Sequence, residues 1–494
     1  MMWLRNIAIV FLFNISIVNS YIEDESTISE ELIELLRLKQ GTEQFDRWVS
    51  TPLDINFKVY LFNVQNINDI MKGATPIVRE VGPYIYKKYR EKHNITYNEE
   101  ADTLEYDEEM WYEFDAEASA PLNENDMITV LNVPMQDLFQ SIEETSSLTV
   151  NATWPKVFQD TTSLFHTISV KDLLFNGYRF CDSTTLIGVT YMIARALCNS
   201  IRNEYASVDT ILIHNDETVA FSFFGHKTRN YDGPYAIKAG NLNIKDIGSI
   251  QTWKNEEYLN NWQGEESTCN KIRGTDGLLY PPFNNKETRF EVYNPDICRV
   301  ETFQTKYNSS FQDIDSNVAR IDSNLFSNEN NEECYCMNAT KPPGKYDCFR
   351  SGFGDMLTCM NYKIITSFPH FLDADVENEI IGLTPTEELH GSSITIEPTT
   401  GWILEANRRM QYNMVVRPIQ NIAVTQNVTS MIMPILWFEE SVKLPDDLVE
   451  KLKNDFLSKL KEVDEEEDND PGVGVNLKPQ YYLLFCICGL FMLH

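Results

Sequence analysis

Six cysteines that fall within one short stretch constrain this chain more than any other feature of its sequence. The stretch that contains them is 91 residues long in a chain of 494, whereas the first 180 residues contain no cysteine. The six are Cys269, Cys298, Cys334, Cys336, Cys348 and Cys359. A cluster of this density indicates a local framework, held either by a metal ion or by disulfide bonds.

The spacing of these cysteines favours disulfides over metal. A zinc site needs four thiolates that reach one ion, and its usual pattern is two close C-x2-C pairs. Only Cys334 and Cys336 stand close together, so no second pair completes a tetrahedral site. The stretch also contains N-glycosylation sequons at Asn308 and Asn338, which matter only in the oxidising secretory pathway. We therefore predict disulfides and no metal, although spacing alone leaves fifteen pairings open.

Three further sequons extend the prediction of a secreted domain beyond this stretch. They begin at Asn94, Asn151 and Asn427. Because such asparagines are modified on the surfaces of secreted proteins, we expect glycans at all five positions and an extracellular location for the domain that bears them.

Four short blocks, in a fixed order with the six cysteines, carry a resemblance to a known family. They are Glu80 to Tyr84 (EVGPY), Gly274 to Gly277 (GTDG), Tyr280 to Phe283 (YPPF) and Phe368 to Leu372 (FPHFL). Together these blocks resemble the class B scavenger receptor family, and the resemblance extends from Phe57 to Glu440. In that family the cysteines pair first with third, second with sixth and fourth with fifth. The resemblance implies the disulfides Cys269–Cys334, Cys298–Cys359 and Cys336–Cys348, each of which would stabilise the fold by roughly 3–5 kcal/mol.

Cys181 and Cys198 stand outside the six and are separated by a largely apolar stretch. They either form one more disulfide or remain buried free thiols. With Gly177 ahead of them, this pair is similar to the insect sensory neuron membrane protein branch of the family.

The resemblance implies the fold class as well. It is α+β: a large, mainly antiparallel β-barrel ectodomain with inserted short helices, an apical helical bundle and an internal hydrophobic tunnel. β-branched and aromatic runs predict strands at residues 57–64, 84–86, 219–225, 289–293 and 414–416, and the spacing of these runs is compatible with such a barrel. The dipeptide Gly82-Pro83 predicts a break before the strand at 84–86. Apolar periodicity predicts helices at residues 29–38 and 445–463.

The two ends of the chain are apolar and leave its topology open. Residues 1–20 form a signal peptide or an N-terminal membrane anchor; about a dozen apolar residues favour a cleaved signal, whereas the resemblance implies a retained membrane helix. Residues 21–463 form a single extracellular domain, which includes the disulfide-rich part 269–359. Residues 464–480 are an acidic linker and spacer. Residues 481–494 form either a short membrane segment or a lipid-anchor signal, with Gly472 as a candidate attachment site.

Charge and motifs exclude several functions. A formal charge of −33 argues against nucleic acid and against docking on anionic lipid by charge. None of the seven histidines lies in an H-E-x-x-H motif, and neither a G-x-S-x-G elbow nor a phosphate-binding loop occurs. We therefore predict that the chain is not an enzyme and that it needs no cofactor.

The resemblance implies a function at the cell membrane. The chain would be a receptor that binds fatty-acid-like ligands and transfers them through its tunnel, among them lipid-like odorants or pheromones that it passes to an odorant receptor. One alternative is a scavenger receptor for lipoproteins or apoptotic cells. Another is a secreted or surface-anchored interaction protein without transport activity.

Overall fold

The computed structural model describes residues 30–143, 147–158, 163–182, 189–228, 230–327, 332–336, 349–376 and 380–458. The chain divides into two compact units. Residues Leu35–Val449 form the larger unit, and Met1–Glu34 with Glu450–His494 form the smaller one. All strands among the described residues belong to the larger unit.

Helices at the two ends of the described chain lie where periodicity predicts them. The first is α2 (Glu30–Leu36), and the last is α11 (Asp446–Lys451), which continues into a π-helical segment, Leu452–Leu457. No helix among the described residues combines the length and the apolarity that a membrane crossing requires. The predicted segments 1–20, 464–480 and 481–494 lie outside these residues, so their assignment stays a prediction.

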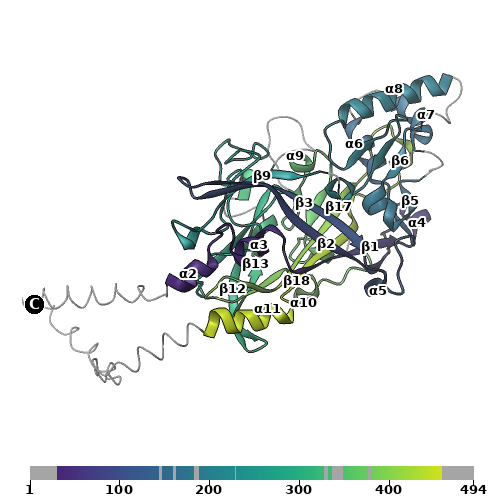
Figure 1. Ribbon diagram of the computed structural model, residues 1–494. Helices are drawn as coiled ribbons and strands as arrows, with labels where there is room; N and C mark the ends of the chain where they lie inside the picture. The colour runs from purple at the N-terminus through teal and green to yellow at the C-terminus, as the bar shows by residue number, and fades with distance from the viewer. Residues whose placement is uncertain are drawn as a thin grey trace, which may run out of the picture. The chain divides into compact units, whose positions relative to one another are not determined.

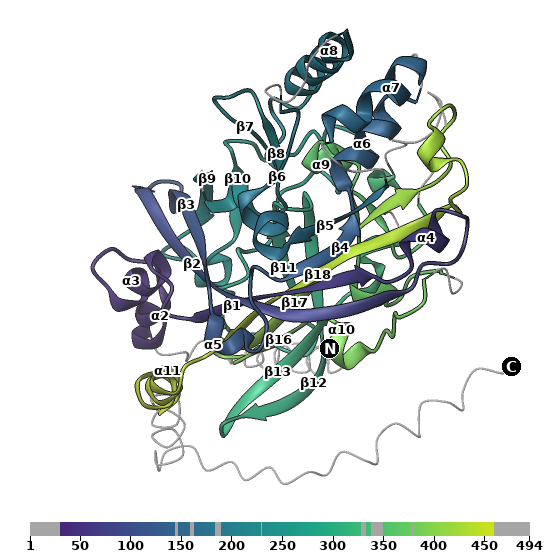
Figure 2. The ribbon, with the colours of Figure 1, turned by 90° about the vertical axis from the view of Figure 1, so that its right-hand side faces the viewer.

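One antiparallel sheet of 13 strands dominates the larger unit. Its main path runs in the order β10-β9-β3-β2-β1-β18-β17-β16-β13-β12-β11, and two short strands join it beside β17. Figures 1 and 2 show the longest strands side by side along the molecule. The strands are β1 (Asp54–Val64), β2 (Val78–Asn98), β3 (Thr103–Phe114), β9 (Asp232–Lys238), β10 (Ile250–Trp253), β11 (Arg289–Asn294), β12 (Arg299–Phe311), β13 (Ile314–Ile321), β14 (Gly354–Asp355), β15 (Ile365–Ser367), β16 (Ser393–Ile396), β17 (Ile403–Val416) and β18 (Met431–Lys443).

Strand β2 is longer than the sequence predicts. The dipeptide Gly82-Pro83 indicates a break, yet β2 runs through it for 21 residues. The pairing of β1 with β2 shifts register between Val59 and Leu61, which absorbs the irregularity. A Cβ atom on Gly82 would lie 2.7 Å from the ring of Tyr60, so only glycine lets the two strands approach this closely.

The two edges of the sheet are joined by the segment that contains the GTDG block. Ile250 of β10 donates its N–H to the carbonyl of Gly274 at 2.8 Å. Thr275 donates to Glu291 of β11 at 2.9 Å, and Tyr293 donates back to Thr275 at 3.0 Å. The sheet is therefore nearly closed, as the barrel prediction requires, and the GTDG segment completes the wall.

Smaller sheets and helices lie beyond one end of the barrel. Figures 1 and 2 both show α6, α7 and α8 gathered at this end, opposite the end that carries α3. The two small sheets comprise β4 (Met127–Leu131) with β5 (Phe165–Ser169), and β6 (Tyr178–Phe180) with β7 (Ile211–Ile213) and β8 (Val219–Phe221). The α-helices of this unit, apart from those at its ends, are α3 (Glu43–Val49), α4 (Ile67–Ile70), α5 (Ala116–Ser119), α6 (Val133–Ser141), α7 (Ser147–Val157), α8 (Val189–Glu204), α9 (Leu357–Met360) and α10 (Glu387–His390).

Two apolar cores hold these layers together. The larger core joins β1, β17 and β18 to α6, α7 and β8, and it includes Phe62, Phe139 and Phe158. The smaller core lies among β11, β12 and β16 and includes Phe290 and Phe303. Single-turn helical segments connect the larger elements: Asp172–Asn176, Gly225–Thr228, Ile244–Asp246, Ser323–Phe326, Glu332–Tyr335, Pro369–Phe371 and Ala423–Thr425.

Three disulfides lie among the described residues. Cys269–Cys334 and Cys298–Cys359 are two of the pairs that the resemblance implies, with Cα–Cα distances of 6.0 and 5.7 Å. Cys181 is bonded to Cys198, so these two cysteines are not free thiols in the structure. Cys336 is also disulfide-bonded, but Cys348 lies outside the described residues, and the pair Cys336–Cys348 stays a prediction.

Closure of the barrel gives a test at Gly274. Its φ is +91°, and an added Cβ would lie 2.5 Å from the carbonyl oxygen of Glu291. Gly274→Ala should therefore lower the free energy of unfolding by about 3 kcal/mol or more in urea denaturation, because a clash adds to the left-handed backbone cost of about 1–2 kcal/mol. Gly41→Ala is the matched control, since Gly41 has φ +86° and nothing within 4 Å of an added Cβ. Equal losses for the two variants would contradict the role of Gly274 in closure.

Candidate functional site

The barrel encloses a large cavity, called the barrel cavity below. Its volume is about 810 Å³. Strands β2, β3, β9, β10, β11, β12, β17 and β18 all contribute lining residues, so the wall draws on most of the sheet. Cavities that bind small molecules typically measure about 300–1,000 Å³, which makes the barrel cavity the candidate functional site.

The wall of this cavity carries many charged side chains. The cationic residues are Lys88, Arg90, Lys227, Lys254, Arg408 and Arg409. The acidic residues are Glu108, Asp209, Asp232, Asp276, Asp296, Glu301 and Glu440. The resemblance implied a hydrophobic tunnel, whereas this cavity has an ionic wall with apolar patches. Polar groups can line it because carboxylates offset the buried cations.

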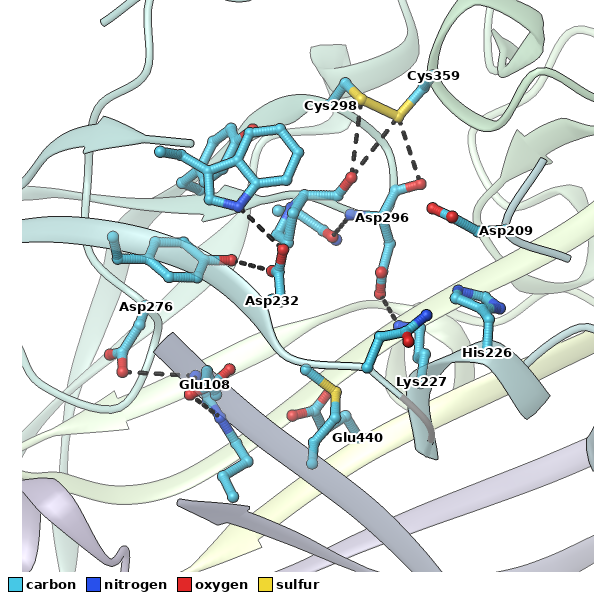
Figure 3. A pocket seen from close by; sticks show the side chains of 18 of the residues that line it. Glu108, Asp209, His226, Lys227, Asp232, Asp276, Asp296, Cys298, Cys359 and Glu440 are labelled. Carbon is cyan, nitrogen blue, oxygen red and sulfur yellow. Dashed lines mark hydrogen bonds and ion pairs between the residues drawn. A yellow bond between two sulfur atoms is a disulfide. The ribbon is translucent and has the colours of Figure 1, made fainter. Parts of the chain in front are cut away.

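Most of the cations in the wall already have a carboxylate partner. Lys88 Nζ lies 3.0 Å from an oxygen of Glu440, and Arg90 Nη2 lies 2.8 Å from an oxygen of Glu108. Arg408 pairs with Glu301 at 2.9 Å, and Arg409 pairs with Glu439 at 2.6 Å. Figure 3 shows a further pair, Lys227 with Asp296. A ligand carboxylate that entered here would compete with a protein carboxylate for each of these cations.

Position in the strands explains how the charges come together. Lys88, Arg90 and Lys92 alternate along β2, so their side chains leave the same face of the sheet. Arg408 on β17 stands directly opposite Glu440 on β18 in the antiparallel register. The charged wall is thus built from pairs on neighbouring strands and from pairs across the barrel.

The ion pairs control the protonation of the wall. Burial alone would raise the pKa of Glu440, but Lys88, Arg408 and Arg90 outweigh it and lower that pKa to about 2. Asp232 behaves oppositely: burial raises its pKa, although Tyr235 and Trp253 donate hydrogen bonds to its carboxylate (Figure 3). Glu440 is therefore ionised at every physiological pH, whereas Asp232 is a weaker acid than an exposed aspartate.

The Cys298–Cys359 disulfide also lies in the wall, beside Asp296 (Figure 3). Sequence reasoning identified these cysteines but assigned no function to the charged residues around them. Lys88, Arg90 and Lys92 alternate in the strand directly after the buried aromatic residues Tyr84 and Tyr86, and this pattern is the sequence signal that could locate the site.

A second cluster, outside the barrel cavity, consists of Glu80, His370 and His390. Their potential ligand atoms lie within 4.8 Å of one another, which is close enough for a metal ion. His370 Nε2 lies 2.6 Å from a carboxylate oxygen of Glu80, and Trp437 Nε1 donates to the same oxygen at 2.7 Å. This cluster ties two of the family-like blocks together.

Hydrogen bonds to the two imidazole rings argue against metal at this cluster. The Nδ1 atom of His370 accepts the N–H of Thr384 at 3.0 Å, and that of His390 accepts the N–H of Thr386 at 2.9 Å. A neutral ring whose Nδ1 accepts must carry its proton on Nε2, so no lone pair is left for an ion. We interpret the cluster as a structural hydrogen-bond network.

The predicted glycosylation sites lie in different surroundings. Asn94, Asn308 and Asn427 have exposed side chains. Asn151 is half-buried, and its amide donates a hydrogen bond to the carbonyl of Asn421. Asn338 lies outside the described residues. Glycosylation at the five positions stays a prediction.

Removing one partner of a buried pair should be costly. Glu440→Gln leaves Lys88 and Arg408 without their full counter-charge, so we expect it to lower the free energy of unfolding by about 3–5 kcal/mol at pH 7. Urea denaturation measures this loss. Glu257→Gln is the control, because the Lys271–Glu257 pair is exposed and its loss should change stability by less than about 1 kcal/mol. A small loss in Glu440→Gln would mean that the pair does not support the wall.

The same carboxylate predicts a pH dependence. The pKa of Glu440 is about 2 in the folded chain and 4.5 without its surroundings, so its stabilising contribution is complete above pH 4.5 and disappears as the pH falls towards 2. This shift corresponds to about 3 kcal/mol. As the pH falls across that range, the free energy of unfolding should decline less steeply in Glu440→Gln than in the unmodified protein. Parallel curves of this free energy against pH would contradict the assignment.

Comparison with known proteins agrees with this architecture. The model of the CD36 family matches residues 7–463. Sensory neuron membrane protein 2 of Anopheles gambiae is 31% identical, over 88% of this chain and 84% of the relative. The protein of the same name in Aedes aegypti is 32% identical, over 86% of this chain and 87% of the relative. Sensory neuron membrane protein 1 of Manduca sexta is 29% identical, over 87% of this chain and 80% of the relative. The chain belongs to the CD36 family, which is the class B scavenger receptor family that the sequence blocks resemble.

Proposed function

We propose that this protein is a membrane receptor whose extracellular domain binds a lipid-like ligand in the barrel cavity and transfers it. The observation that carries the proposal is the cavity of about 810 Å³ inside a nearly closed sheet. Members of the CD36 family are receptors rather than enzymes, which agrees with a cavity built for binding.

The lining favours an amphipathic ligand. Met110, Ile250, Met410 and Phe438 offer apolar surface, and burial of hydrocarbon contributes about 25 cal/mol per Å². Because the pairs around Glu440, Glu108 and Glu301 already neutralise their cations, an uncharged polar end fits better than a free carboxylate. We therefore propose fatty-acid-derived chains with a neutral polar end as the ligand class.

A sensory role fits the relatives best. The names of the similar insect proteins describe sensory neuron membrane proteins, and we extend that role to this chain, with lipid-like odorants or pheromones as ligands and an odorant receptor as recipient. In this proposal helices α6, α7 and α8 form the apical bundle where the ligand enters a tunnel. The alternatives of a lipoprotein or apoptotic-cell receptor and of an interaction protein without transport are not favoured by any particular contact among the described residues.

We also propose that glycans and a further disulfide protect the extracellular domain. Glycans at Asn94, Asn151, Asn308, Asn338 and Asn427, and the disulfide Cys336–Cys348, would protect an extracellular domain that comprises residues 21–463. Peptide mapping by mass spectrometry before and after deglycosylation tests each position.

Lipid mass spectrometry of the glycosylated protein made in insect cells tests ligand binding. We expect about one hydrocarbon-chain molecule per protein. Met410→Trp should reduce that occupancy several-fold because Met410 lines the cavity, whereas Met127→Trp, at an exposed residue of β4, should not change it. Protein that stays empty and takes up neither fatty alcohol, fatty acid nor sterol would overturn the proposal.

A further inference from the structure

A small second cavity, called the apolar pocket below, lies next to the barrel cavity on the side of α3. Its volume is about 80 Å³. Most of its lining is apolar, with Trp48 of α3, Leu53, Leu279, Trp402, Leu444 and Leu448 among the contributors. For scale, a dry apolar cavity of about 150 Å³ is enough to bind benzene. The apolar pocket can therefore hold a short piece of hydrocarbon chain but not a whole lipid.

Four buried charged residues separate the two cavities. Arg90, Glu108 and Asp276 line the barrel cavity, while Lys92 and Asp276 line the apolar pocket. Asp276 thus borders both spaces, and the wall at this point is one residue thick. We call Arg90, Lys92, Glu108 and Asp276 the charged partition.

The members of the partition are held mainly by one another. Arg90 Nη2 lies 2.8 Å from Glu108 and 3.5 Å from Asp276. Lys92 Nζ lies 3.5 Å from Asp276 and 3.9 Å from Glu108. The exposed fractions of the four side chains range from 2% to 11%. Two cations and two carboxylates balance, so the partition is a neutral, closed network.

Two aromatic rings complete the wall. Trp48 and Tyr106 meet edge to face with their ring centroids 5.1 Å apart. Trp48 lines the apolar pocket and Tyr106 lines the barrel cavity. Lys92 Nζ lies over both rings, 5.1 Å and 5.3 Å from their centroids. The cation therefore holds the ring pair as well as the carboxylates.

Strand register and the GTDG turn position the four charged side chains of the partition. Arg90 and Lys92 leave the same face of β2, and Lys92 stands opposite Glu108 of β3 in the register. Asp276 belongs to the GTDG block, between Gly274 (φ +91°) and Gly277 (φ +81°), and its carboxylate accepts the N–H of Leu278 at 3.0 Å. The block that closes the barrel therefore also supplies the residue shared by the two cavities.

We propose that the apolar pocket is a second binding site, which takes the hydrocarbon end of the ligand, and that the charged partition is the barrier between it and the barrel cavity. This inference rests on the proposed function. Hydrocarbon cannot pass without separating buried charge pairs, which is unfavourable in a medium of low polarity. The partition accordingly determines how readily a chain moves from one site to the other.

The test uses a long-chain fatty alcohol with a diazirine at the end of its chain, added to the full-length glycosylated protein in detergent. Light-induced labelling followed by peptide mass spectrometry locates the chain end. Stopped-flow fluorescence with a fluorescent analogue measures its release. In the unmodified protein we expect labels on residues of both cavities, among them Trp402 and Leu444 of the apolar pocket.

The variant Lys92→Met/Asp276→Asn removes one cation and one carboxylate and leaves the Arg90–Glu108 pair intact. Asparagine keeps the acceptor for Leu278, so the turn retains its hydrogen bond. We expect release to be at least fivefold faster, and the share of label in the apolar pocket to rise.

Two further variants keep the test independent of folding. Lys171→Met/Glu124→Gln removes a lysine–carboxylate pair, 2.6 Å apart, that lines neither cavity, and it should leave release unchanged. Thr51→Phe fills the apolar pocket, so labelling there should disappear while labelling of the barrel cavity persists. The two active variants therefore act on the apolar-pocket label in opposite directions.

The outcomes separate the inference from the proposed function. Absence of any labelling in the unmodified protein would reject ligand binding altogether. Labelling confined to the barrel cavity, or equal release rates in the Lys92→Met/Asp276→Asn variant and the unmodified protein, would overturn the second site and its barrier but leave the first site standing.

Discussion

The hydrogen bonds that join Gly274 and Thr275 to the two sheet edges close the barrel, and the character of its interior follows from this closure. Without them β10 and β11 would be open edges, and the interior of the sheet would be in contact with water. Closure instead encloses a cavity whose ion pairs are screened far less by solvent. Glycine is needed at position 274 because the strand of Glu291 passes where a side chain would stand. One backbone approach thus determines both the barrel and the electrostatics inside it.

Enclosure changes the consequence of each charge in the wall. A lysine and a glutamate that meet on a surface contribute little, whereas Lys88 and Glu440 inside the barrel cannot be separated without leaving a buried charge unpaired. Each cation of these pairs already faces a carboxylate, so the pairs offer little net attraction to an ion. Apolar patches lie between pairs that are already neutralised, so the ionic wall is compatible with the lipid-like ligand that we propose.

Local patterns in the sequence predicted what depends on local chemistry. β1 and β11 follow from runs of β-branched and aromatic residues, and the cysteine spacing indicates disulfides, although the pairing Cys298–Cys359 is implied only by the family resemblance. The site could not be predicted in the same way. Lys88 and Glu440 are 352 residues apart in the chain, and no periodicity connects them. The strand break predicted from Gly82-Pro83 is wrong, because β2 pairs with its neighbours on both sides of this dipeptide and continues through it.

The GTDG block serves both the closure of the sheet and the charge balance of its interior. Its glycines permit the backbone approach that closes the sheet, while Asp276 between them projects into the wall that the sheet encloses. A turn that served closure alone would need no carboxylate, because Gly274 and Thr275 make the hydrogen bonds to both edges through their backbone. The carboxylate balances Arg90 and Lys92, which alternate on β2 and would otherwise be buried without sufficient counter-charge. Asp276 is therefore the residue through which the closing segment and the charged interior depend on each other.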